Sequence, residues 1–172
     1  ASGVAVIRIS GEETSSVIKL INKGKLPEPK KATLVKMNNI NNSELIDEGL
    51  ILWFPGPNSY TGEDMAELHV HGSVAVIKAI FKILSDTKKC RLAEPGEFTK
   101  RAFQNGKINL IKAESIADLI SSETEMQRKQ AIKMMTGRSN NVLNELREKL
   151  LKVLSQVEAK IDFPEEDLPN EI

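Results

Sequence analysis

The feature that most constrains this chain is a stiff polar loop between two apolar segments, within WFPGPNSYTGEDMAELHVHGS at residues 53–73. Residues 50–54 (LILWF) and 66–71 (AELHVH) have the apolar character expected of strands. The Pro-Gly-Pro run at 55–57 forbids both a helix and a strand ladder. We therefore expect two strands joined by an ordered loop that forms a platform for a ligand. The alternative is an ordinary long hairpin loop.

A second dense stretch, EPGEFTKRAFQNGK at residues 94–107, predicts a turn followed by a short helix. Pro95 and Gly96 fix the turn, and Glu97 belongs to the first helical turn. The helix has an apolar face made of Phe98, Ala102 and Phe103. The cations around it are Lys100, Arg101 and Lys107. This combination supports a binding site.

The rest of the chain predicts an α+β domain followed by a long helical hairpin. Strands are expected at 3–10, 32–37, 45–54, 66–71 and 91–93, and helices at 12–22 and 74–85, the latter capped by Ser73. The inward positions of the second helix are Val76, Ile77, Ile80, Phe81 and Leu84. The domain boundary is expected between residues 112 and 113.

The hairpin is expected to consist of one helix over 113–135, ended by Gly137, and a second helix stopped by Pro164. The second helix has an apolar seam with alternating steps of three and four residues, as in a coiled coil, at Leu143, Leu146, Leu150, Val153 and Val157. Two helices bury such seams poorly, so further helices are expected to pack on them.

Composition sets limits on function. The 172 residues carry no net charge, which argues against a protein that coats nucleic acid but leaves room for a local basic face. The single cysteine, Cys90, allows no internal disulfide, so we expect a reducing, cytoplasmic location. No apolar run approaches the length of a membrane span, so no membrane association is expected.

Glu67 and Arg8 are the first candidate site residues. Glu67 lies in the middle of an expected strand and, with a period of two, shares a face with His69 and His71. A carboxylate there can accept two parallel N–H bonds from a flat heterocycle such as a pterin; a solvated strand face is the alternative. Arg8 is the one cation within an apolar strand and needs a carboxylate, phosphate or ligand as its partner.

Three further residues have weaker signals. His69 and His71 form an H-x-H pair that can bind zinc, but a third protein ligand is not evident, so hydrogen bonding is the favoured role. Lys107 follows the Asn105-Gly106 turn, where an ammonium group can meet an anionic group, although surface lysines usually have no such role. Cys90 lies between two cations that can lower the pKa of its thiol.

Three long motifs carry a family resemblance. FPGPNSYTGEDMAELHVHG, EPGEFTKRAFQNGKINLIKAESIADLI and AKIDFP, in this order, resemble the MnmE (TrmE) family of tRNA-modification GTPases. The resemblance runs from GVAVIRISG at 3–11 to DFPEED at 162–167. It departs from the family in one respect, because no G-x-x-x-x-G-K-[ST] loop is present to hold the phosphates of GTP. We therefore expect the N-terminal portion of such a protein, trimmed at both ends.

The resemblance implies a mixed-sheet domain over 1–112 that binds tetrahydrofolate, similar to glycine-cleavage aminomethyltransferases, and the first part of a helical domain over 113–172. By motif, the folate contacts fall on Arg8, Glu67 and Lys107, and the donor is a 5-formyl- or 5,10-methylene-tetrahydrofolate. The family forms homodimers and works with the flavin-dependent MnmG (GidA) on C5 of the wobble uridine of tRNA. GTP, Mg²⁺ and K⁺ belong to a GTPase domain outside this chain, which by itself is not expected to hydrolyse GTP.

Two other classes of function remain open. One is a dimerisation scaffold without a ligand, which is favoured if packing fills the face around Glu67. The other is a metal-dependent hydrolase that uses His69, His71 and a carboxylate such as Glu67, which requires these groups to converge on one point.

Overall fold

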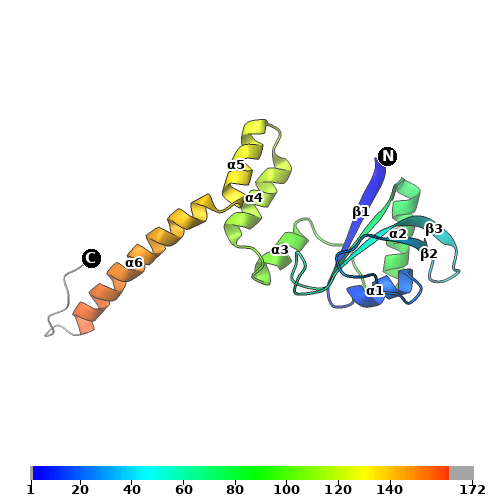
Figure 1. Cartoon of the computed structure of the whole chain (residues 1–172), viewed down its shortest axis with the longest axis horizontal. Helices are drawn as coiled ribbons and strands as arrows, with labels where there is room; N and C mark the ends of the chain where they lie inside the picture. The colour runs from blue at the N-terminus through cyan, green and yellow to red at the C-terminus, as the bar shows by residue number, and fades with distance from the viewer. Residues whose placement is uncertain (1, 163–172) are drawn as a thin grey trace. The chain divides into compact units, whose positions relative to one another are not determined.

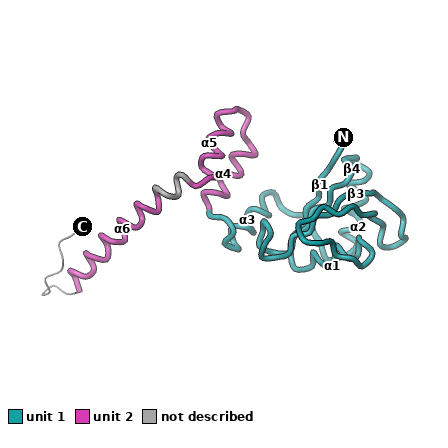
Figure 2. Tube along the Cα trace, in the orientation of Figure 1, with its two compact units in different colours: residues 1–109 teal, residues 110–172 magenta. Residues whose placement is uncertain are grey.

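The structure is a computed structural model that describes residues 2–162, except for the side chains of residues 138–142. The chain divides into two compact units, residues 1–109 and 110–172, shown in teal and magenta in Figure 2. The division comes after residue 109, whereas the sequence placed it after residue 112. In the described part of the chain, no helix combines the length and the apolar character needed to cross a membrane.

The first unit contains four strands and three helices (Figure 1). Their bounds are β1 Ser2–Ser10, α1 Thr14–Ile21, β2 Thr33–Asn38, β3 Leu45–Phe54, β4 Met65–Gly72, α2 Val74–Asp86 and α3 Glu97–Gln104. These elements confirm the strands expected at 3–10, 32–37, 45–54 and 66–71 and the helices expected near 12–22, 74–85 and after Gly96. The fold class of the unit is α+β.

The strand expected at 91–93 is wrong, since these residues are irregular. A strand needs a ladder partner, and residues 91–93 form no ladder with β1 at the edge of the sheet or with any other described strand. The Arg91 side chain instead bonds back to the Leu92 carbonyl at 3.0 Å and pairs with Glu97. These local bonds hold the segment in a turn-like course toward α3.

The sheet has the strand order β1-β4-β3-β2, and all three ladders are antiparallel. The expected mixed sheet is therefore wrong. Strands β1 and β3 run in the same direction, but β4 returns between them, so each strand has only antiparallel ladder neighbours in the described residues. Residues 2–162 contain a single parallel pairing, an isolated bridge between Pro29 and Trp53.

The pleat of the sheet divides its residues between two faces. Ile7 lies opposite Leu68 on the face that α1 and α2 cover, and both side chains are buried. Arg8 lies opposite Glu67 on the other face, which we call the open face. The residue pattern of β1 and β4 thus separates the hydrophobic core from the candidate site.

Helices α1 and α2 supply the other half of the core. Val17, Ile18 and Ile21 of α1 are almost fully buried. On α2, Ile80 and Leu84 are buried as expected, whereas Phe81 is 39% exposed and Ile83 takes the inward position instead. Ser73 caps α2 as expected, because its side chain accepts a hydrogen bond from the Val76 N–H at 3.1 Å.

The described residues of the second unit, 110–162, form three helices where a two-helix hairpin was expected. They are α4 Leu110–Ser121, α5 Glu125–Met135 and α6 Arg138–Asp162. The single helix expected over 113–135 is interrupted by a capping box, in which Thr124 accepts from the Gln127 N–H and the Gln127 side chain accepts from the Thr124 N–H. These paired bonds start a new helix, so α4 and α5 pack on each other as separate helices.

Helix α6 follows Gly137, whose φ of 84° confirms the expected helix end there. The expected apolar seam is present and remains largely open to solvent: Leu143, Leu146, Leu150, Val153 and Val157 are between 44% and 61% exposed. The stop at Pro164 lies outside the described residues.

Neighbouring residues of α1 provide a test of the core. Replacing the buried Ile21 by Ala is expected to lower the free energy of unfolding by about 2–5 kcal/mol, because it leaves a cavity. Replacing Leu20, which is 47% exposed on the same helix, should cost less than about 1 kcal/mol. Urea unfolding of both variants measures the difference, and equal losses would contradict this description of the core.

Candidate functional site

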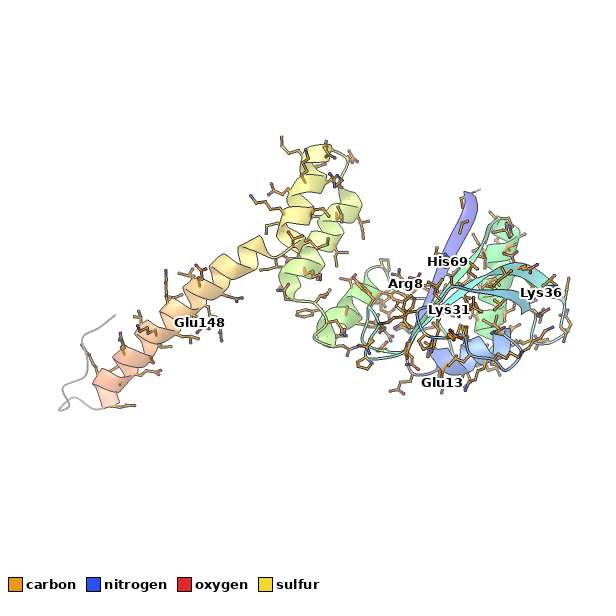
Figure 3. All side chains as sticks on the ribbon, viewed as in Figure 1. Arg8, Glu13, Lys31, Lys36, His69 and Glu148 are labelled. Carbon is orange, nitrogen blue, oxygen red and sulfur yellow. The ribbon has the colours of Figure 1, made fainter. Side chains whose placement is uncertain are left out.

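The centre of the candidate site is a carboxylate held by two neighbours on the open face. Arg8 donates to Glu67 Oε1 from Nε at 3.0 Å and from Nη2 at 2.7 Å. His69 Nε2 lies 3.2 Å from the other oxygen, Glu67 Oε2. Figure 3 labels Arg8, which lies on β1, and His69, which lies on β4. The expected partner of Arg8 is therefore a carboxylate, and one of the two histidines that share a face with Glu67 contacts it.

These contacts keep Glu67 ionised. Partial burial by itself would raise the pKa of the Glu67 carboxyl, but the hydrogen bonds from Arg8 and His69 outweigh it, and the pKa falls below its ordinary value. The Glu67 side chain is 17% exposed. It is thus a negative, oriented acceptor that solvent reaches only partly.

Two aromatic rings from different elements flank the Arg8 guanidinium. Its central carbon lies 6.0 Å from the ring centre of Tyr60 and 5.7 Å from that of Phe98. Tyr60 belongs to the β3–β4 loop, residues 55–64, and Phe98 belongs to α3. The Tyr60 hydroxyl and Thr99 Oγ1 are 3.0 Å apart and form a hydrogen bond. The two dense sequence stretches therefore meet around Arg8.

The β3–β4 loop is anchored through a buried threonine. Thr61 is fully buried, and its hydroxyl lies 2.6 Å from Ser10 Oγ at the end of β1. Its carbonyl accepts from Asn105 Nδ2 at 2.7 Å. The Asp64 carbonyl accepts from the Gly11 N–H and from the Thr14 hydroxyl. The loop is therefore fixed by several elements of the first unit.

An ion-pair network joins the same loop to α3. Arg101 Nη1 lies 2.9 Å from Glu63 Oε2, and Arg101 Nη2 lies 2.8 Å from Glu97 Oε1. Glu97 also receives Arg91 Nη2 at 2.6 Å. Hydrogen bonds from Arg91, the Glu94 N–H and Arg101 lower the pKa of Glu97 to about 2. This network links the β3–β4 loop, the segment before α3 and α3 itself through ion pairs.

Lys107 lies against the loop and makes no described contact with Arg8 or Glu67. Its Nζ donates to the Pro57 carbonyl at 2.8 Å. Gly62, with φ of 81°, allows this approach, because a Cβ there would lie 3.2 Å from Lys107 Cγ and Asn105 Cβ. The structure thus brings two of the three predicted folate contacts together and places the third at the tip of the loop.

The two histidines do not converge on one point. The His71 N–H donates to Asp47 Oδ2 at 2.8 Å, and His71 Nδ1 lies 2.7 Å from Asp47 Oδ1, whereas His69 contacts Glu67. Burial by itself would raise the pKa of Asp47, but the bonds from His71 outweigh it and lower the pKa. Within the described residues, no three histidine, cysteine or acidic side chains are placed to hold a metal ion.

A cleft of about 1170 Å³ runs along β1. Residues 5–10 form one wall, and residues of α2, the segment 89–93 and α3 form the others. Arg8 lines this cleft, but Glu67 and Lys107 do not. The cleft and the open face therefore meet along β1, where both Val6 and Arg8 line the cleft.

The pKa of the Cys90 thiol is not lowered by the neighbouring cations, contrary to expectation. Partial burial raises the pKa of the thiol. The two neighbouring cations are engaged elsewhere, because Lys89 pairs with Glu13 and Arg91 pairs with Glu97. A reactive thiolate is thus not favoured at this position.

Comparisons with known proteins place the whole chain. Residues 1–107 match the family described as GTP-binding protein TrmE N-terminus, and residues 110–172 match the MnmE helical domain. Proteins named tRNA modification GTPase MnmE are 69% identical in Pelagibacter ubique, 48% in Phenylobacterium zucineum and 44% in Roseobacter denitrificans. Each alignment covers 99% of this chain. The chain spans 38–40% of the length of these relatives.

The low pKa of Glu97 gives a test by pH. The folded-state pKa is lowered, so the stability that Glu97 contributes is complete above its ordinary pKa of 4.5 and is lost as the pH falls toward about 2. The Tm difference between the wild type and Glu97→Gln should therefore be largest above pH 4.5 and close to zero near pH 2. Glu94→Gln, which keeps the backbone donor, is the control. A difference that stays constant with pH would contradict the network.

Proposed function

This chain belongs to the MnmE (TrmE) family of tRNA modification GTPases, and from that premise we propose that it is the part that binds a tetrahydrofolate one-carbon donor and dimerises. The donor is a 5-formyl- or 5,10-methylene-tetrahydrofolate. The full-length protein uses it for carboxymethylaminomethylation at C5 of the wobble uridine of tRNA, in the cytoplasm and together with MnmG (GidA). GTP hydrolysis, with Mg²⁺ and K⁺, belongs to a domain outside these residues, because the sequence has no phosphate-binding loop.

The observation that carries the folate proposal is the oriented Glu67 carboxylate. A pterin presents two parallel N–H donors on its pyrimidine edge, and an ionised carboxylate with its oxygens held in place is complementary to that pair. A carboxylate has about four lone-pair positions, of which Arg8 uses two at Oε1 and His69 uses one at Oε2. Glu67 therefore keeps one acceptor position at Oε2, and a second bond to the pterin edge requires Arg8 to release one of its two bonds to Oε1.

Arg8 and Lys107 are proposed to contact the other polar groups of the folate. Arg8 uses Nε and Nη2 on Glu67, which leaves the two N–H groups of Nη1 to donate to a ligand. The Lys107 ammonium has three donors and uses one on the Pro57 carbonyl. Lys107 lies against the β3–β4 loop and not beside Glu67. We therefore expect its ammonium group to bind an anionic group of the folate that lies away from the pterin edge.

The homodimer proposal rests on the open face of the sheet. Antiparallel sheets with one solvated face normally carry polar side chains there. Here that face carries four exposed apolar residues from three strands, namely Val4, Val6, Leu34 and Leu50. We propose that a second copy covers this face. The folate residues Arg8 and Glu67 would then lie at the edge of, or within, the dimer contact.

The Glu67 carboxylate can be tested by calorimetry with a reduced folate. Glu67→Gln is expected to weaken binding by about 1–3 kcal/mol, because it removes a charge-assisted pair. Glu48→Gln is the matched control, since Glu48 is an exposed glutamate on β3 opposite Lys36. Equal affinity of the Glu67→Gln variant and the wild type would remove Glu67 from the site.

The dimer proposal can be tested on a fragment of residues 1–112. This fragment lacks α6, so the exposed apolar seam of that helix cannot cause its self-association. Light scattering at micromolar concentration should give the mass of a dimer. The Val6 side chain on the open face is 51% exposed. Val6→Asp places a charge there and should give a monomer, while the circular dichroism spectrum of the folded unit stays unchanged. A monomeric 1–112 fragment would contradict dimerisation through this unit, and a dimeric Val6→Asp variant would contradict the open face as the contact.

A further inference from the structure

One connecting segment of this neutral chain is rich in lysine and poor in acidic residues. Residues 19–31 contain five lysines and one acidic residue, Glu28, which gives a local charge of +4, so the remaining residues together carry −4. We call this segment the lysine loop; its lysines are Lys19, Lys23, Lys25, Lys30 and Lys31. It comprises the end of α1 and the connection to β2. A neutral protein therefore carries a basic surface of limited extent.

The lysines of this loop are available to a partner. All five are exposed. Among the described ion pairs, only Lys31 has a partner in the loop, at 2.9 Å from Glu28. By contrast, the three lysines of α6 are interspersed with three glutamates along the helix, at Glu145, Glu148, Lys149, Lys152, Glu158 and Lys160. The loop is thus a positive patch, whereas the α6 surface is of mixed charge.

The backbone of the loop is well defined. The Gly24 N–H donates to the Lys19 carbonyl at 2.7 Å, and the Lys30 N–H donates to the Trp53 carbonyl of β3 at 2.7 Å. Lys23 and Lys30 have φ of 48° and 59°, a region that favours glycine and is unusual for a bulky side chain. Lysine thus occupies two positions where the backbone alone would favour glycine, and the outward lysines are displayed on a fixed frame.

The chemistry of the loop points to phosphate groups rather than bases. Lysine ammonium groups bind phosphates as point charges, and the loop has no aromatic side chain for stacking and no arginine for a bidentate base contact. We propose that the lysine loop binds the phosphate backbone of tRNA, independently of base sequence. This inference rests on the proposed function, in which tRNA is the substrate of the full-length protein.

The salt dependence of tRNA binding tests the proposal. With the full 172-residue chain and a labelled tRNA transcript, log Kobs should fall linearly with log salt concentration, by about 0.7–0.9 for each phosphate neutralised. A triple variant, Lys23→Gln with Lys25→Gln and Lys30→Gln, should lower the steepness of this line by about 2–3 and weaken binding at least about tenfold at low salt. The matched control replaces Lys149, Lys152 and Lys160 by Gln, which changes the net charge equally.

The control triple should bind tRNA with unchanged salt dependence. Equal losses in both triples would show a general effect of net charge and overturn the proposal, as would a wild-type chain that binds anionic vesicles but not the transcript. Titration of a reduced folate onto the same variants separates the two proposals. If the chain binds folate but the loop triple variant binds tRNA as the wild type does, only the lysine-loop proposal is contradicted. If the loop triple variant loses tRNA binding but the wild type does not bind folate, only the folate proposal is contradicted.

Discussion

Arg101 joins two carboxylates that come from different parts of the chain, and the geometry of the candidate site depends on this bridge. Glu63 lies in the β3–β4 loop and Glu97 lies at the start of α3, so the guanidinium fixes the loop against the helix. The same two elements supply the two aromatic rings beside the Arg8 guanidinium. Arg8 in turn orients Glu67. The carboxylate at the centre of the site is therefore placed by a chain of contacts that begins outside it.

The two faces of the sheet have different roles: one packs in the hydrophobic core, and the other carries the candidate site. On the covered face, aliphatic side chains such as Ile7 and Leu68 exclude water and stabilise the unit. On the open face, the alternate residues carry the ionised cluster and several exposed apolar side chains. Because the pleat has a period of two, a register shift of one residue in β4 would move Glu67 into the core. The core therefore also fixes the direction in which Glu67 points.

Much of this architecture could be predicted from the sequence because its signals are local. The Pro-Gly-Pro run marked the loop, and the period of two in β4 placed Glu67 on one face with His69 and His71. Part of what was missed was also local: the T-x-x-Q pattern at Thr124 starts α5, and the Glu97–Arg101 spacing of four is typical of a helical ion pair.

Other features depend on contacts between distant residues and have no such pattern. The bond between Asp47 and His71 is one, although an acidic residue at an inward position of a strand already indicates a buried partner. The arrangement of Tyr60 and Phe98 around Arg8 is another, because residues from three segments form it. The strand order is a third, since local alternation is the same in mixed and antiparallel sheets.

The exposed apolar seam of α6 has a consequence for how the second unit behaves in solution. An isolated helix of this kind gains little from backbone hydrogen bonds alone, and most helical stability in proteins comes from packing of the apolar face. Its leucines are about half exposed in the described structure, so they provide little of that packing. The stability of α6 therefore depends on contacts that cover its seam more than on its own backbone hydrogen bonds.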